Sequence, residues 1–151
     1  MALYLFVILG IIAIDQVVKW WAIVILKEMG SLPIIQGVFH LTYVENTGAA
    51  FSIFSGKQVF LVMITSIAMT IMLVYLMKWT QKPGDAWAKM AFAMMIGGGI
   101  GNLIDRLRFG FVVDMFDARI INFAIFNVAD SFVVVGVILF VISEVFLKAK
   151  A

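Results

Sequence analysis

Four stretches of the chain are long and apolar enough to cross a lipid bilayer, and this feature constrains the fold more than any other. A spanning helix needs about 20 mainly apolar residues. Of the 151 residues, 64% are hydrophobic and 13% are charged. A soluble domain is usually about half apolar and about a quarter charged. The sequence therefore predicts a mainly α-helical, polytopic membrane protein with four transmembrane helices in one membrane domain, residues 1–151, over residues 3–26, 59–77, 86–104 and 131–147.

Two connecting segments are expected on the side of the membrane opposite the termini. They are residues 27–58 and residues 105–130. Residues 38–44 are rich in β-branched and aromatic side chains, which favours a short strand. Residues 121–126 are interpreted as a short apolar strand or an interfacial stretch. We therefore expect a small β-rich extracytoplasmic segment that lies along the membrane surface.

The basic residues do not decide the orientation. Short cytoplasmic loops normally carry the excess of lysine and arginine. Here five stand on each side: Lys78, Lys82, Lys89, Lys148 and Lys150 against Lys27, Lys57, Arg106, Arg108 and Arg119. We expect cytoplasmic termini, because Arg106 lies beside Asp105 and is interpreted as part of a site rather than as a free loop charge.

Composition excludes several kinds of chemistry. The chain has no cysteine and a single histidine, His40. Disulfides and thiol nucleophiles are therefore excluded, no metal site or cofactor is expected, and His40 is interpreted as a polar interfacial residue. The net charge of +2 is too small to indicate nucleic acid. The first apolar run lacks a basic leader and a cleavage site, so we expect it to be retained.

Ionisable side chains at membrane depth are costly and mark candidate functional sites. Asp15 and Lys19 are four residues apart, so they share a helix face and can form an ion pair. The structural interpretation is an ion pair that also tethers a neighbouring helix. The functional alternative is a proton or ion relay.

A second cluster lies near the end of the third apolar stretch. Spacings of three and four residues place Asn102, Asp105 and Arg106 on one helix face. The guanidinium beside Asp105 should keep that carboxyl ionised, which favours a scaffold or substrate-positioning role. Gly97 and Gly101 have the spacing that lets a second helix backbone approach closely.

The remaining aspartates follow this cluster in the chain. Asp114 stands among apolar residues, so burial would raise its pKa, although a surface position in a turn is the alternative. Asp117 and Arg119 are interpreted as solvated loop residues. Asn127 and Asp130 stand before the fourth stretch, where helix capping is an alternative to catalysis.

Together these residues predict a pair of carboxylates at one membrane face. Two carboxylates in a low-dielectric site cannot both ionise easily, so one holds a proton while the other acts as a base. An aspartic peptidase uses such a pair to activate water and to protonate the scissile carbonyl. The residues alone leave Asp105 and Asp114 as rival candidates for one member of this pair.

Five sequence blocks, in order, resemble the lipoprotein signal peptidases, the bacterial signal peptidase II family. They are distributed over nearly the whole chain, although Phe123 is followed by Ala124 where the family often has proline. The blocks are DQVVK (15–19), ENTGAAFS (45–52), GNLIDR (101–106), VVDMFD (112–117) and FNVADS (126–131).

The resemblance implies an aspartic endopeptidase of the bacterial inner membrane. It would remove the signal peptide from prolipoproteins by cleaving before a cysteine that carries a diacylglyceryl group. Both termini would be cytoplasmic, the active site would lie near the outer face, and the family's cyclic peptide antibiotics would occupy the same pocket. The sequence gives no sign of an oligomer, so we expect a monomer in contact with membrane lipid.

The resemblance also assigns site residues. Asp114 and Asp130 match the catalytic pair. Positions that match substrate-binding or site-supporting residues are Asp15, Lys19, Asn46, Asn102, Asp105, Arg106, Asn127 and Ala129. The main alternative function is a small four-helix transporter coupled to protons or cations. A purely structural membrane partner is a further option, but it does not explain the concentration of aspartate and asparagine.

Overall fold

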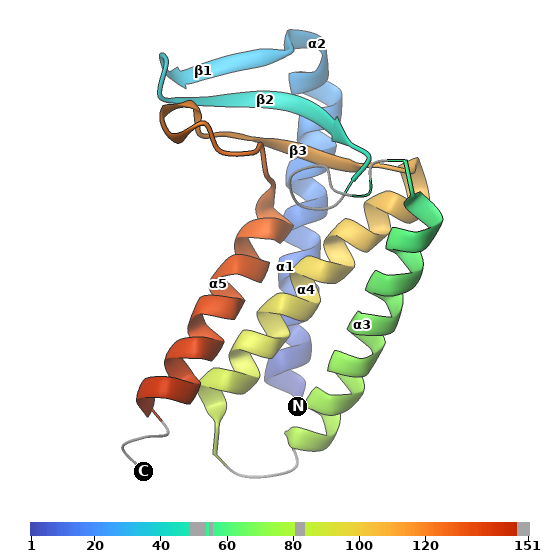
Figure 1. Ribbon diagram of the computed structural model, residues 1–151, viewed down its shortest axis with the longest axis vertical. Helices are drawn as coiled ribbons and strands as arrows, with labels where there is room; N and C mark the ends of the chain where they lie inside the picture. The colour runs from blue at the N-terminus through green and yellow to red at the C-terminus, as the bar shows by residue number, and fades with distance from the viewer. Residues whose placement is uncertain (49–53, 55, 81–83, 148–151) are drawn as a thin grey trace.

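Four long helices run side by side, and a small sheet lies across one end of them (Figure 1). The computed structural model describes residues 1–48, 54, 56–80 and 84–147. The N-terminus lies at the end of the bundle away from the sheet. The long helices are α1 (Ala2–Trp21), α3 (Gln58–Trp79), α4 (Ala86–Phe109) and α5 (Val128–Ile142); η1 (Ala22–Leu26) and α2 (Lys27–Met29) continue α1, and η4 (Ser143–Leu147) continues α5.

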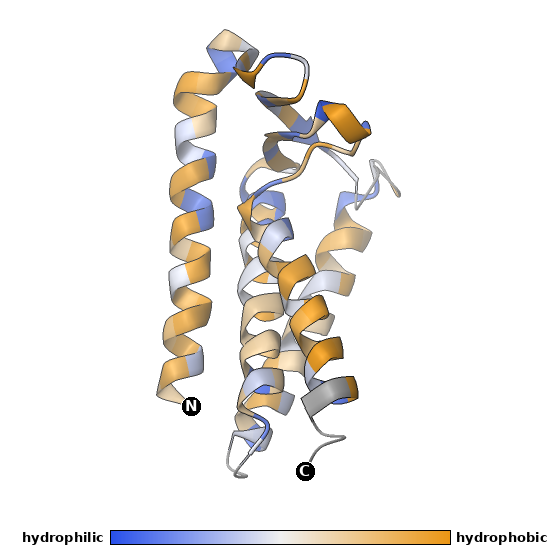
Figure 2. Ribbon diagram, turned by 90° about the vertical axis from the view of Figure 1, so that its left-hand side faces the viewer, coloured by the Kyte–Doolittle hydropathy of each residue, from blue (hydrophilic) through white to orange (hydrophobic). Residues whose placement is uncertain are grey.

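Three helical segments are long and apolar enough to cross a membrane: Ala2–Met29, Gln58–Trp79 and Val128–Val145. These helices consist mainly of hydrophobic residues, as Figure 2 shows, and large apolar side chains such as Phe6 and Val59 are exposed. Exposed apolar side chains of this kind are suited to contact with lipid. With three such segments, the chain is a multi-pass membrane protein.

Helix α4 is long enough to cross a membrane but is less apolar than the other three long helices. Of the four predicted transmembrane helices, three are therefore supported by length and composition. Helix α4 packs against α1, α3 and α5, and its neighbours rather than lipid surround much of its surface. This position explains why α4 carries a cluster of glycines and polar side chains in place of a continuous apolar run.

Two helices extend beyond the membrane spans expected from the sequence, and both extensions carry site residues. Helix α4 continues to Phe109, so Asp105 and Arg106 lie in its last turns and not in a surface segment. Helix α5 begins at Val128, three residues earlier than predicted, because Asn127 already provides the N-cap. Asp130 therefore lies in the first turn of α5 and not before the helix.

The sheet contains three antiparallel strands in the order β1-β2-β3. The strands are β1 (Ser31–Ile35), β2 (Phe39–Asn46) and β3 (Val112–Asp117). The strand predicted at residues 38–44 is confirmed as β2, whereas β1 and β3 were not predicted. Of the two interpretations of residues 121–126, the strand is wrong: the chain makes a short 3-10 helix, η3 (Arg119–Ile121), and a single bridge between Phe116 and Phe126.

Side-chain alternation along β3 places Asp114 on the face of the sheet opposite to Val113 and Met115. Val113 and Met115 pack against Ala22 and Leu26 of η1, which continues α1. Successive side chains of a strand point to opposite faces, so Asp114 projects from the other face of the sheet. Asp114 is also buried, which excludes the alternative of a surface aspartate in a turn.

Glycines in α4 allow close helix packing, as their spacing predicted. A Cβ atom at Gly97 would lie 3.0 Å from Cβ of Ile11, and one at Gly101 would lie 2.6 Å from a carboxylate oxygen of Asp15. A Cβ atom at Gly98 would overlap the carbonyl oxygen of Ala129 in α5. The glycines therefore bring both α1 and α5 against α4 beside the polar cluster.

We predict that Gly98→Ala destabilises the protein by about 1–3 kcal/mol, because the added methyl group meets backbone that cannot rotate away. The measurement is the thermal unfolding midpoint in detergent. Gly10→Ala is the matched control, since a Cβ atom there meets no heavy atom of the described residues within 4 Å beyond its own stretch of helix. An equal effect of the two substitutions would contradict the proposed packing.

Candidate active site

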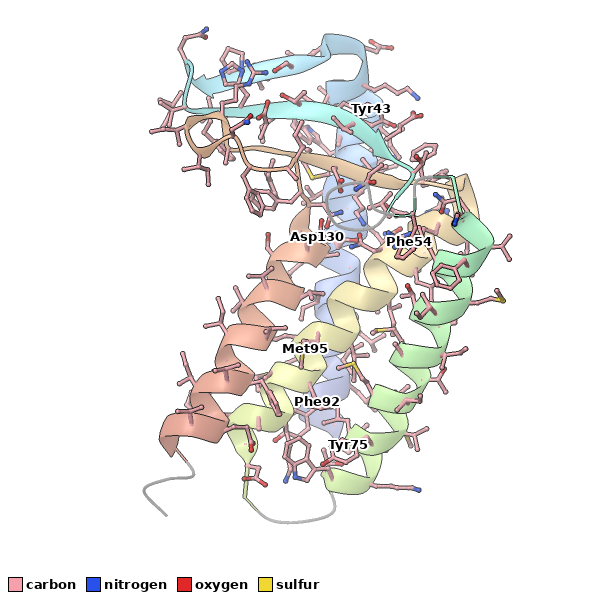
Figure 3. All side chains as sticks on the ribbon, viewed as in Figure 1. Tyr43, Phe54, Tyr75, Phe92, Met95 and Asp130 are labelled. Carbon is pink, nitrogen blue, oxygen red and sulfur yellow. The ribbon has the colours of Figure 1, made fainter. Side chains whose placement is uncertain are left out.

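Polar side chains from α1, α4, α5 and the sheet meet at the sheet end of the bundle. In Figure 3, Asp130 lies at the top of α5 beneath the sheet, far from Tyr75 and Phe92 at the opposite end. The structure brings together all ten residues that the sequence singled out: Asp15, Lys19, Asn46, Asn102, Asp105, Arg106, Asp114, Asn127, Ala129 and Asp130.

Lys19 is the buried centre of the cluster. Its ammonium group lies 2.9 Å from a carboxylate oxygen of Asp15 and 2.9 Å from one of Asp105. It also donates a hydrogen bond of 2.8 Å to Oδ1 of Asn102. The three contacts match the three N–H donors of a lysine. The ion pair predicted between Asp15 and Lys19 is therefore confirmed, and it does join α1 to neighbouring elements.

The partner predicted for Asp105 was wrong. Asp105 pairs with Lys19 of α1, not with the adjacent Arg106, and it also accepts a hydrogen bond from Nε2 of Gln16. Arg106 points elsewhere and donates to the carbonyl oxygen of Gly48. Neighbouring residues of a helix project in directions roughly 100° apart, so adjacency in the sequence does not make them partners.

Both carboxylates that pair with Lys19 also accept hydrogen bonds from backbone N–H groups. Asp15 accepts a hydrogen bond of 2.9 Å from the N–H of Ala129. Asp105 accepts one of 3.1 Å from the N–H of Val113. Ala129 precedes Asp130 and Val113 precedes Asp114, so the ion cluster fixes the two chain segments that carry these aspartates.

Asp114 is buried beneath the sheet, with 1% of its surface exposed. One of its carboxylate oxygens accepts a hydrogen bond of 2.9 Å from Asn46, and the other accepts one of 2.7 Å from Asn127. Burial raises the pKa of Asp114 to about 7; the two amide donors oppose this shift, and the carboxylate of Asp130 adds to it. Asp114 can therefore hold a proton near neutral pH.

Asp130 lies in the first turn of α5 and takes part in its cap. Asn127 accepts a hydrogen bond from the N–H of Asp130, and the Asp130 carboxylate accepts one of 3.3 Å from the N–H of Asn127. This reciprocal capping box confirms the capping interpretation. The other oxygen of Asp130 accepts a hydrogen bond of 2.7 Å from Nδ2 of Asn102, so the cap also places this carboxylate beside the cluster.

A cavity of about 790 Å³ opens onto both aspartates. Its polar end includes Asn102 and Arg106, and Nε of Arg106 is buried without a hydrogen-bond partner among the residues that the structure describes. The remaining wall is mainly apolar, with residues 123–126 on one side and 133–135 of α5 on another. A cavity of this form suits a ligand with a polar reacting group and a large apolar portion.

Sequence reasoning missed Gln16 and misjudged Asp117. The side chain of Gln16 contacts Asp105 and the carbonyl oxygen of Gly101, and its position three residues before Lys19 was a usable signal. Asp117 is largely buried in β3, where it accepts hydrogen bonds from Thr42 and Arg119, so it is not a solvated loop residue.

His40 lies on the sheet, apart from the cluster around Lys19. It is buried, and its Nε2 accepts a hydrogen bond from the backbone N–H of Gly37. Within the described part of the chain, no three His, Cys, Asp or Glu side chains are grouped so as to hold a metal ion.

Comparison with known proteins identifies the family. A family model described as signal peptidase (SPase) II matches residues 7–146. The chain belongs to the signal peptidase II family. The lipoprotein signal peptidase of Clostridioides difficile (strain 630) is 41% identical over 149 residues, which cover 99% of each chain. That of Streptococcus thermophilus (strain CNRZ 1066) is 44% identical over 135 residues, which cover 89% of this chain and 87% of the relative.

Two solved structures have the same fold as this chain. One bacterial membrane enzyme, solved by the in meso method, aligns with a TM-score of 0.81 and 33% identity, covering all of this chain and 91% of the other. A second aligns with a TM-score of 0.78 and 32% identity, covering 97% of this chain and 94% of the other. The helices and the sheet are thus shared with enzymes embedded in membranes.

We predict that Lys19→Met destabilises the protein by about 3–5 kcal/mol, because it leaves two buried carboxylates without their counter-ion. The unfolding midpoint in detergent measures the effect. Lys27→Met is the matched control: it removes an exposed ion pair with Glu45 and should change the midpoint little. If both variants unfold at the same temperature as the unmutated protein, the cluster does not stabilise the fold.

Proposed function

We propose that this protein is a membrane-embedded aspartic endopeptidase in which Asp114 and Asp130 are the catalytic pair. The observation that carries the proposal is that both carboxylates line one cavity, each held by amide donors. The matches to lipoprotein signal peptidases support the same activity. The rival Asp105 is engaged by Lys19, Gln16 and backbone, so it is poorly placed to act on a substrate.

The two aspartates can divide the chemistry between them. Asp130 as a carboxylate takes a proton from water, and the water oxygen attacks the scissile carbonyl carbon. Asp114 donates its proton to the carbonyl oxygen, which gives a gem-diol. When the C–N bond breaks, Asp130 returns its proton to the leaving amine and a gem-diol hydroxyl returns one to Asp114. Both carboxyl groups end in their starting protonation states.

The proposed substrate is a prolipoprotein that carries a diacylglyceryl group on a cysteine, with cleavage just before that cysteine. The apolar wall of the cavity suits the lipid and the apolar signal peptide. Arg106 and Asn102 at the polar end are suited to orient the scissile region. Cyclic peptide antibiotics of the kind that act on the family would compete for this cavity.

The same proposal includes an orientation of the chain in the membrane. We infer that the whole chain forms one membrane domain of the bacterial inner membrane, with α4 as the fourth span. The termini would be cytoplasmic, and the sheet and cavity would lie near the outer face, where a translocated lipoprotein arrives. We expect the protein to act as a monomer without a cofactor.

The alternative of a proton- or cation-coupled transporter has less support. Asp15, Lys19, Asp105, Asp114 and Asp130 gather beneath the sheet in one hydrogen-bonded cluster, which suits a single site better than a path along the helices. In addition, the donors of Lys19 are occupied by fixed partners, which suits a structural ion pair better than a relay.

We predict that Asp114→Asn and Asp130→Asn each abolish cleavage of a diacylglyceryl-modified prolipoprotein by the purified protein in detergent or lipid. Loss of either group removes the acid or the base, which should lower the rate at least about 100-fold. Asp117→Asn is the matched control, because Asp117 lies on the same strand and contacts Thr42 and Arg119 instead of the cavity. Cleavage by a folded Asp114 or Asp130 variant at the unmutated rate would exclude that residue from catalysis.

The pH dependence should report the proton on Asp114. Burial raises the pKa of this carboxyl to about 7, so the pair keeps one proton below that pH and loses it above. We predict that kcat/KM falls as pH rises through about 7. A rate that increases through this range would show that the singly protonated pair is not the active form.

A further inference from the structure

The orientation of the Asn102 amide decides which aspartate receives its hydrogen bond. An asparagine side chain has one acceptor oxygen and one donor nitrogen, and exchanging their positions would reverse every contact it makes. In the structure, Oδ1 of Asn102 accepts hydrogen bonds from Lys19 and Asn127, and its Nδ2 donates to Asp130. Something must hold the amide in this orientation.

Lys19 supplies that constraint. An ammonium group can only donate hydrogen bonds, so the atom of Asn102 that faces it must be the oxygen. The amide nitrogen is then directed at Asp130. Polarisation of the amide by the buried cation also strengthens the hydrogen bond that Asn102 donates. Lys19 therefore acts on Asp130 through one intervening side chain.

A second constraint agrees with the first. The backbone N–H of Asp130 can only donate, so it fixes Oδ1 of Asn127 towards itself. The amide nitrogen of Asn127 then faces Asp114 and Oδ1 of Asn102. The two amides thus have consistent orientations, and neither can reverse without placing two donors face to face.

The environments of the two carboxylates differ accordingly. Asp130 accepts a hydrogen bond from the Asn102 amide, which itself accepts one from the Lys19 ammonium group. Asp130 also lies in the first turn of α5, where the helix dipole favours an anion. Among the residues that the structure describes, Asp114 accepts hydrogen bonds only from the neutral amides of Asn46 and Asn127, and it is almost fully buried.

We propose that Lys19 is a positioning residue that, by orienting the Asn102 amide, makes Asp130 the ionised member of the resting pair and leaves the proton on Asp114. The proposal rests on the function proposed above. It goes further because it names the residue that causes Asp130 to act as the base and Asp114 as the acid, through the orientation of the Asn102 amide.

The test uses Asn102→Asp, because the strong destabilisation expected on removal of Lys19 would obscure any effect on catalysis. An aspartate at this position keeps an acceptor for Lys19 and Asn127 but presents a carboxylate to Asp130 instead of a donor. We expect kcat/KM to fall at least about tenfold at about pH 7.5 and to recover at about pH 5.5, where a shared proton restores a donor. The charged groups around position 102 are Lys19, Arg106, Asp114 and Asp130, with Asp15 and Asp105 beyond Lys19.

Asn46→Asp is the matched control, since it adds the same charge beside the other carboxylate. A carboxylate there should raise the pKa of Asp114 further, so the alkaline limb of the pH profile should move to higher pH. Opposite shifts in the two variants support the proposal. Shifts in the same direction, or a loss in Asn102→Asp that is equal at all pH values, would overturn it.

An infrared measurement keeps the test independent of cleavage and of the folding of the Asn102 variant. At about pH 6 the carbonyl stretch of a protonated carboxyl should disappear in Asp114→Asn and remain in Asp130→Asn. The reverse result would overturn the assignment. Failure of the proposed function would appear separately, as no cleavage by the unmutated protein, and the infrared comparison would still locate the proton.

Discussion

A single buried ammonium group connects the parts of this protein that carry its candidate chemistry. An unpaired charge inside an apolar bundle would be very unfavourable, so Lys19 requires partners on every donor. Its two carboxylate partners need further donors of their own, and they obtain them from the backbone of α5 and of β3. Satisfying one cation therefore joins α1, α4, α5 and the sheet, and it places the residues before Asp114 and Asp130.

This arrangement matters more in a membrane than it would in water. Lipid tails are as apolar as the helix surfaces, so hydrophobic burial gives little force to bring helices together. Close packing and interhelical polar contacts must supply the specificity. Gly97, Gly98 and Gly101 provide the close approach, and the cluster around Lys19 provides the polar contacts at the same end of α4. The exposed apolar side chains hold the protein in lipid, and the polar cluster determines how its helices meet.

Sequence patterns predicted what depends on composition and local spacing, and failed where partners come from distant elements. The apolar stretches, the strand at residues 38–44, the pairing of Asp15 with Lys19 and the close approach at Gly97 and Gly101 all follow from side-chain type at short separations. The counter-ion of Asp105 lies on α1, many residues away, and adjacency in the chain suggested Arg106 instead. Strand β3 was not predicted because Asp114 and Asp117 interrupt its apolar pattern; Asp114 lines the cavity, whereas Asp117 contacts Thr42 and Arg119. The choice between Asp105 and Asp114 needed the resemblance to signal peptidase II, because both aspartates are buried and both have polar neighbours.

The burial that makes Asp114 useful also makes it a source of instability. Its pKa is raised to about 7 in the folded protein, whereas an unfolded chain would ionise it near pH 4. The folded state therefore binds this proton more tightly, and stability from this group declines as pH rises from about 4 to about 7. A hydrophobic residue at this position would avoid the penalty but could not donate a proton. The amide donors from Asn46 and Asn127 reduce the penalty without removing it, so the carboxyl remains near the pH at which it can both hold and release a proton.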